Sequence, residues 1–453
     1  MTKDDFSNLV ISLILPLFTG SSIIGEGVST SRDSEVAQGS NGTVLVKAHK
    51  TDEYRFIIRR SQPFKTADVS LLRTIIAELV KISELNLTER GYVQSLQSTA
   101  IEKAVCQAVS ENNSETILGV INSLSHWANR TYEGNHLNFG IIVNESEESP
   151  IPNFNLSYVK MLESDFFALL SDGKQSCVEL DKNGQLTGHI LMDRVRFATT
   201  LCPYEFINVA RYCSDNRIGI SYLANGDLLI FKNRELVFAN RRDVWISYCH
   251  DEIIQLLSNR TSHTMKEIRK AIYFTALDCS FTNSGGCLAY LNKDKCAIAL
   301  EHIDIHDIVS ETHFELKKQM ELDMAKNMSV VTETIEPENF FIPFADFLQK
   351  KNSSKTHALV QIIDGRKFHE LSRKLRQEII GMDGATIIDY DGTIIAVGAI
   401  VKIEAGSTGG GRLAATKTLA KYGVAVKISV DGTVEGYTFD KKFNAPKPIF
   451  SLG

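Results

Sequence analysis

Residues 381–437 read GMDGATIIDYDGTIIAVGAIVKIEAGSTGGGRLAATKTLAKYGVAVKISVDGTVEGY and carry the most informative pattern in the chain. Within this segment, Thr386–Ile388 and Thr393–Ile400 are apolar and rich in β-branched residues, which favours β-strands. Asp391-Gly392 separates the two runs, and this dipeptide is typical of the tight turn that joins antiparallel strands. The segment therefore predicts a hairpin at its start.

A glycine-rich stretch follows this hairpin. Residues 406–411 read GSTGGG, and Arg412–Tyr422 is rich in alanine and leucine, which predicts a turn that leads into a helix. Gly423 stands where such a helix would end, and Val424–Val430 has the composition of a strand. The predicted order is therefore strand, glycine turn, helix and strand.

This order suits the binding of a phosphate group. Glycines let backbone N–H groups approach an anion closely, and a helix N-terminus adds unpaired donors and a favourable dipole. Arg412 offers bidentate hydrogen bonds to phosphate oxygens, while Ser407 and Thr408 offer hydroxyl donors. The alternative interpretation is a flexible loop before a helix, with Arg412 in solvent.

The spacing from Gly406 to Gly411 also approaches the P-loop pattern G-x-x-x-x-G-K-[ST]. Arg412 stands in place of the lysine, however, and Leu413 stands in place of the hydroxyl residue that binds Mg²⁺. We therefore do not assign the segment to the P-loop NTPases.

Asp383 opens the first strand of the segment, in the triplet Asp383-Gly384-Ala385. An acidic residue at a strand edge near a phosphate-binding turn is a candidate ligand for Mg²⁺ or Mn²⁺, and it can also orient or deprotonate a hydroxyl group. The alternative is a turn aspartate that hydrogen-bonds its own backbone near Gly384.

A second candidate for metal binding is the cluster HIDIHD, with His302, Asp304, His306 and Asp307. On a helix the two histidines, four residues apart, would share a face. No third ligand is evident, and the apolar residues alternate with polar ones as in a strand. We therefore prefer to interpret this group as a polar surface cluster.

The whole chain has 453 residues, enough for two or three domains that each bury a core. Its formal net charge of −6 argues against a dedicated nucleic-acid binder. We predict an α/β (α+β) fold, with a mixed sheet flanked by helices in the C-terminal domain and a mixed α/β region before it. The expected parts are an N-terminal segment with a linker at 24–43 (1–45), a mixed α/β part (46–150), a strand-rich part (151–245) and the C-terminal domain (246–453).

Local patterns predict further elements. Asn183-Gly184 and Asn225-Gly226 predict hairpin turns. Apolar periodicity predicts helices over Leu71–Ile82, Val93–Val109, Ser114–Trp127, Val244–Leu257 and Met265–Leu277, and strands over Leu137–Val143, Cys287–Leu291 and Cys296–Leu300.

The eight cysteines form no C-x-x-C pair, so a structural zinc site is not expected. Several lie in apolar surroundings, which favours reduced, buried thiols and a cytoplasmic location. No stretch reaches the roughly 20 apolar residues that span a bilayer. Leu9–Phe18 comes nearest, and we interpret it as a docking helix or strand.

Taken together, residues 263–440 resemble the nucleotide-binding domain of the DisA-type diadenylate cyclases. The resemblance begins with the helix Ile268–Leu277 and the strand after Gly285-Gly286. It continues with Asp383-Gly384-Ala385, which matches the family's D-G-A motif. It ends with Ala414-Ala415 and the strand Ala425–Val430, which match the region of the family's second motif.

The resemblance implies an enzyme that joins two ATP molecules into the second messenger cyclic di-AMP with Mg²⁺ or Mn²⁺. It implies that Asp383 binds the metal and helps to activate a 3′-hydroxyl group, and that Arg412 holds phosphates as a catalytic residue. It also implies a homo-oligomer in which two such domains meet face to face. The remaining nucleotide-binding candidates are Gly384, Ala385, Ser407, Thr408, Gly409, Gly410 and Gly411.

The second motif departs from the family pattern, which is Arg-His-Arg before the two alanines. Here the residues are Gly411-Arg412-Leu413, so the histidine and both flanking arginines are replaced. The chain is then either a working variant, a nucleotide-binding sensor or scaffold without turnover, or a different nucleotidyl transferase. Only about a dozen residues follow Asp440, so we expect no DNA-binding region. By analogy of architecture, the first 240 residues are expected to sense an unidentified ligand.

Overall fold

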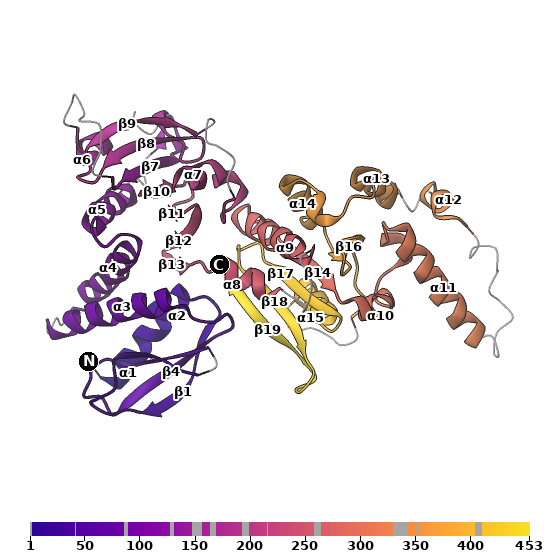
Figure 1. The fold of residues 1–453 in the computed structure, drawn as a ribbon, viewed down its shortest axis with the longest axis horizontal. Helices are drawn as coiled ribbons and strands as arrows, with labels where there is room; N and C mark the ends of the chain where they lie inside the picture. Colours follow the sequence, from indigo (N-terminus) through magenta and orange to yellow (C-terminus); the bar gives the residue numbers. More distant parts are fainter. Residues whose placement is uncertain are drawn as a thin grey trace. The chain divides into compact units, whose positions relative to one another are not determined.

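The computed structural model describes residues 2–40, 42–85, 89–126, 131–146, 156–163, 169–192, 199–214, 216–257, 264–328, 342–350, 354–403 and 410–453. The chain divides into two compact units, Met1–His250 and Asp251–Gly453. Both contain helices and mixed β-sheets, which confirms the predicted α/β fold class (Figure 1). None of the helices in the described residues is both long and apolar enough to cross a bilayer.

The first unit contains a four-stranded antiparallel sheet in the order β1 (Ser21–Val28), β4 (Tyr54–Arg60), β3 (Thr43–Val46) and β2 (Val36–Gln38). The prediction of a linker or mobile loop over 24–43 is therefore wrong for the residues that form β1 and β2. In β1, half-buried and exposed residues alternate along the whole strand, and the strand pairs with β4 from end to end. Its glycines and serines resemble a loop in composition, but the backbone ladder with β4 decides the conformation.

Three longer helices follow in this unit: α3 (Thr66–Glu84), α4 (Arg90–Val109) and α5 (Ser114–Ser125). They confirm the helices predicted from apolar periodicity, although Trp127 lies outside the described residues. In α3 the buried apolar residues recur at helical spacing and cover one face of the helix.

A seven-stranded mixed sheet completes the first unit, in the order β13-β12-β11-β10-β7-β8-β9. The predicted hairpins at Asn183-Gly184 and Asn225-Gly226 are confirmed, because β8 pairs with β9 and β10 pairs with β11. The bounds are β7 (Phe139–Asn144), β8 (Ser176–Asp181), β9 (Leu186–Leu191), β10 (Arg217–Tyr222), β11 (Leu228–Lys232), β12 (Glu235–Arg241) and β13 (Val244–Ser247).

The predicted helix over Val244–Leu257 is only partly correct. Its first residues form β13, which pairs with β12, and a helix begins only at His250 (α8, His250–Leu256). One continuous apolar core extends from Phe6 to Trp245. The first unit is therefore one compact body, where the sequence suggests three parts.

The second unit contains a six-stranded sheet in the order β16-β15-β14-β17-β18-β19. Only β14 and β15 run parallel to each other, and every other neighbouring pair is antiparallel. One edge of the sheet therefore collects the starts of β14 and β15 and the ends of β16 and β17. The bounds are β14 (Gly286–Leu291), β15 (Ala385–Ile388), β16 (Ile394–Ala399), β17 (Gly423–Ile428), β18 (Val434–Asp440) and β19 (Ala445–Leu452).

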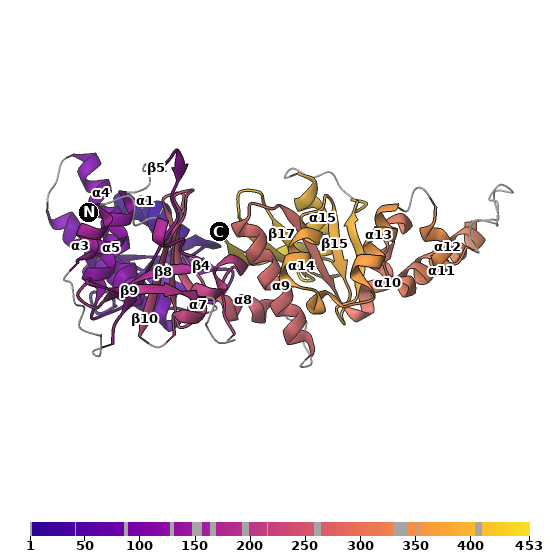
Figure 2. The same ribbon diagram turned by 90° about the horizontal axis from the view of Figure 1, so that it is seen from above.

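Helices cover both faces of this sheet. Figure 2 shows α15 (Gly411–Leu419) on one side of the strands and α9 (Thr264–Phe281) and α14 (Arg373–Ile380) on the other. Successive side chains of β14 point to opposite faces of the sheet, which agrees with this arrangement. A Cβ atom on Gly286 would meet Ile380 of α14, whereas the Cys287 Sγ lies 3.3 Å from the Thr416 Oγ1 of α15.

The α15 face also carries α10 (Cys296–Leu300) and α11 (Glu311–Met328). The prediction of a strand over Cys296–Leu300 is wrong. Cys296, Ala299 and Leu300 are buried, and their spacing of three and four residues places them on one helical face against the core.

The remaining α-helices and β-strands in the described residues are shorter. They are α1 (Lys3–Leu9), α2 (Leu15–Leu17), α6 (Tyr158–Leu162), α7 (Ile207–Tyr212), α12 (Phe344–Leu348), α13 (Ser354–Ile363) and the short strands β5 (Thr131–Tyr132) and β6 (Asn135–His136).

The turn between β15 and β16 holds two coupled carboxylates, Asp389 and Asp391. Asp389 is buried and accepts hydrogen bonds from the backbone N–H groups of Asp391 and Thr393, each at 3.0 Å. Burial and the neighbouring Asp391 raise the pKa of Asp389 to about 7. The hydrogen bond with Asp389, and then Lys367 at 2.9 Å, hold the pKa of Asp391 well below its usual range.

This turn predicts a pH-dependent stability. Folded Asp389 binds its proton more tightly than the unfolded chain does, so its contribution to the unfolding free energy falls as pH rises from about 4 to about 7. Urea unfolding should show that Asp389→Asn gains stability relative to the native chain over this range, on the order of 2 kcal/mol. Asp431→Asn, at an exposed turn aspartate, is the control, and a constant difference across the range would contradict the assignment.

Candidate functional site

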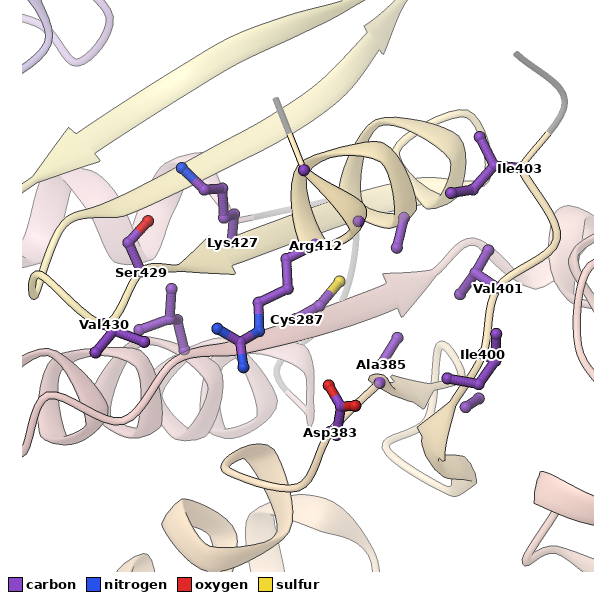
Figure 3. A pocket seen from close by; sticks show the side chains of 16 residues that line it. Cys287, Asp383, Ala385, Ile400, Val401, Ile403, Arg412, Lys427, Ser429 and Val430 are labelled. Carbon is purple, nitrogen blue, oxygen red and sulfur yellow. The ribbon is translucent and has the colours of Figure 1, made fainter. Parts of the chain in front are cut away.

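A cavity of about 520 Å³ opens at the sheet edge where the starts of β14 and β15 meet the ends of β16 and β17. The start of α15 forms a further wall. Segments that are far apart in sequence therefore contribute side chains to one cavity (Figure 3).

The structure brings together most of the candidate site residues that the sequence identifies. All of those that are described line this cavity: Asp383, Gly384, Ala385, Gly410, Gly411 and Arg412. Ser407, Thr408 and Gly409 lie outside the described residues.

Gly384 is required by the backbone that places Asp383. Its φ is +104°, and a Cβ atom there would lie 2.4 Å from the carbonyl carbon of Gly398. Only glycine adopts this conformation without strain and permits this approach. Ala385, the next residue, is fully buried and pairs with Cys287 in the parallel ladder, which fixes the start of β15 against β14.

The start of α15 presents backbone donors to the cavity. Gly410 is the N-cap residue, with φ +84° and no side-chain capping hydrogen bond. The first helical bond runs from the Ala414 N–H to the Gly410 carbonyl, and no partner is found within the described residues for the N–H groups of Gly411, Arg412 and Leu413. These donors and the helix dipole favour an anion at this point.

Opposite charges line the cavity from two sides. Arg412 is half-buried and Asp383 is exposed, and neither has an ion-pair partner among the described residues. Figure 3 shows Arg412 extending from α15 across β14, toward the side of the strand on which Asp383 lies. The hydrogen-bond donors at the start of α15 and the Asp383 carboxylate therefore face one space.

The sequence analysis missed Lys427 and Ser429, which line the same cavity from the end of β17. The sequence pattern that could have identified them is a pair of polar residues, two positions apart, at an otherwise apolar strand. This spacing places both side chains on one face of the sheet. Lys427 is paired with Glu435 of β18 at 3.0 Å and points away from Asp383 (Figure 3).

The Cys287 thiol forms part of the cavity wall. Burial raises its pKa to about 11, so the thiol is protonated at neutral pH and is not a thiolate nucleophile. Its Sγ atom lies against the Thr416 hydroxyl, which in turn donates to the Arg412 carbonyl at 2.8 Å. This chain of contacts holds the first turn of α15 on β14.

Among the described residues, no group of three or more His, Cys, Asp or Glu side chains is placed to hold a metal ion. The HIDIHD cluster is used for packing instead. His302 is buried, with Nε2 2.6 Å from the Tyr422 hydroxyl and Nδ1 3.0 Å from the Lys402 carbonyl. His306 stacks on Phe347.

The geometry at Gly384 predicts a specific loss of stability. Gly384→Ala should lower the unfolding free energy of the protein by about 1–3 kcal/mol, because the new Cβ atom collides with the backbone of Gly398 at a strained φ. Gly411→Ala is the matched control, since its Cβ atom meets no heavy atom of the described residues within 4 Å. Equal urea midpoints for the two variants would show that this backbone conformation is not required.

Comparisons of the chain with protein-family models, with curated proteins and with solved structures found no match.

Proposed function

We propose that the second unit binds ATP in this cavity and condenses two ATP molecules into cyclic di-AMP. The observation that carries the proposal is the placement of Asp383 and of the start of α15, with Arg412, on the walls of one cavity. Asp383 belongs to the triplet that matches the D-G-A motif of the DisA-type cyclases, and Arg412 stands just before Ala414-Ala415, at the position of the histidine in the family's second motif.

The triphosphate would lie against the start of α15. There, three backbone N–H groups without partners among the described residues and the Arg412 guanidinium can donate to phosphate oxygens. Lys427 adds a second positive charge at the end of β17, although Glu435 partly neutralises it. The apolar side chains of Ile400, Val401 and Ile403 line the part of the cavity near the end of β16 and offer a surface for the base.

Among the described residues that line the cavity, Asp383 carries the one carboxylate that could bind a divalent metal. This fits Mg²⁺ or Mn²⁺, because Mg²⁺ is commonly held by one or two carboxylates together with substrate phosphates rather than by an all-protein cage. Asp383 would be the protein ligand, since its carboxylate has no ion-pair partner among the described residues. Such an ion would neutralise negative charge that develops on the phosphoryl oxygens.

In the proposed reaction, the 3′-hydroxyl oxygen of one ATP attacks the α-phosphorus of the other. A new P–O bond forms, the bond to pyrophosphate breaks, and the hydroxyl proton passes to Asp383 or to water. A second, reciprocal attack closes the ring and releases a second pyrophosphate. Because one cavity holds one ATP, two copies of the chain must face each other.

The alternative is a sensor or scaffold that binds ATP without turnover. One observation favours it: the position of the family's histidine is Arg412, and none of the described residues that line the cavity is a histidine. The first unit would be the regulatory part in either case. It has a polar cavity of its own, of about 440 Å³, lined by residues that include Asp172, Lys174, Glu205 and Arg211.

Mass spectrometry of the protein incubated with ATP and Mg²⁺ or Mn²⁺ tests the proposal. We expect cyclic di-AMP from the native chain and at least a hundredfold less from Asp383→Asn, because the variant loses the negative charge that holds the metal and accepts the proton. Asp294→Asn, at an exposed aspartate outside the cavity, should leave the product unchanged.

Three other outcomes of this experiment would lead to different conclusions. Unchanged product from Asp383→Asn would refute the role of this carboxylate. Bound ATP without product in any sample would favour the sensor. A product of a different mass would indicate another nucleotidyl transferase.

A further inference from the structure

Gly285, just before β14, lies directly beneath the Arg412 guanidinium. A Cβ atom on Gly285 would lie 2.4 Å from Arg412 Nη1, 3.0 Å from Arg412 Cζ and 3.0 Å from Val430 Cγ2. No real Cβ atom tolerates the first of these distances, so the guanidinium occupies space that only a glycine leaves open.

The backbone itself does not require glycine at this position. Gly285 is not among the residues with positive φ, so an alanine can adopt its conformation. Its neighbour Gly286 differs, because a Cβ atom there would lie 2.6 Å from the Ile380 carbonyl oxygen. The missing side chain of Gly286 therefore lets α14 pack on the sheet. The missing side chain of Gly285 leaves room for the Arg412 side chain.

Within the described residues, few other contacts hold the guanidinium in place. Arg412 has no ion-pair partner within the described part of the chain, and Val430, the other side chain close to Gly285, is 57% exposed. A long side chain without a charged partner ordinarily samples several rotamers. The missing side chain of Gly285 leaves room for the guanidinium. Figure 3 shows this group over β14, on the side of the cavity toward Asp383.

We infer that Gly285 is a positioning residue, which holds the Arg412 guanidinium where it binds the triphosphate. This inference rests on the proposed function, because it specifies how the anion site of that cavity is kept in order. Gly285→Ala would displace the guanidinium without removing its charge. The loss of affinity would then come from geometry, since a bidentate contact needs both N–H donors in place.

A double-mutant cycle tests this inference. The probe is adenosine 5′-(α,β-methylene)triphosphate, whose methylene bridge prevents release of pyrophosphate, and its affinity is measured by calorimetry with Mg²⁺. We expect Arg412→Ala to weaken binding about tenfold to a hundredfold, the effect of losing charge-assisted hydrogen bonds. Gly285→Ala should weaken binding by at least fivefold in the native background and by less than twofold in the Arg412→Ala background.

If Gly285→Ala weakens probe binding equally in both backgrounds, its role is merely structural and the inference is overturned. The inference is also overturned if Gly285→Ala leaves the affinity of the native chain for the probe unchanged. If Gly285→Ala fails to fold, the cycle is measured with Gly285→Ala and Val430→Ala combined, which removes the second close contact of the new Cβ atom and leaves its collision with Arg412. The proposed function fails separately, through a native chain that does not bind the probe or an Arg412→Ala variant that binds it unchanged.

Discussion

The candidate site depends on the direction of two neighbouring strands. β14 and β15 run parallel, while β16 and β17 on either side run antiparallel to them. This pattern places two strand starts and two strand ends at one edge of the sheet. Because α15 leads into β17 and packs on β14, its N-terminus is brought to the same edge. A helix start, a carboxylate and two cations therefore meet without any local sequence signal that would bring them together.

At two glycines, neighbouring backbone segments come close together and determine the shape of this edge of the sheet. Gly286 lets the end of α14 reach β14, and Gly384 lets the chain before β15 pass against Gly398. These approaches fix the path from α14 to Asp383, because only four residues connect Ile380, the end of α14, with Ala385, the start of β15. Gly285 leaves room for a side chain instead of a backbone. The three glycines thus have different physical roles, although they look alike in the sequence.

Much of the second unit could be predicted because its signals are local. The turn at Asp391-Gly392 and the glycines before Arg412 identify the β15–β16 hairpin and the start of α15. The run Cys296–Leu300 could not be assigned correctly, because a short apolar run fits a strand and a buried helix equally well. Lys427 was missed for another reason. Its place in the cavity depends on the pairing of β17 with β14, a long-range contact that no local pattern encodes.

The account depends most on the claim that Asp383 and the start of α15 form one nucleotide site. Crystals grown with adenosine 5′-(α,β-methylene)triphosphate and Mn²⁺ would test this directly, because anomalous scattering locates the metal. We predict a manganese peak at the Asp383 carboxylate, with the triphosphate oxygens on the N–H groups of Gly411 and Arg412. A triphosphate bound elsewhere, or a manganese ion distant from Asp383, would contradict the account.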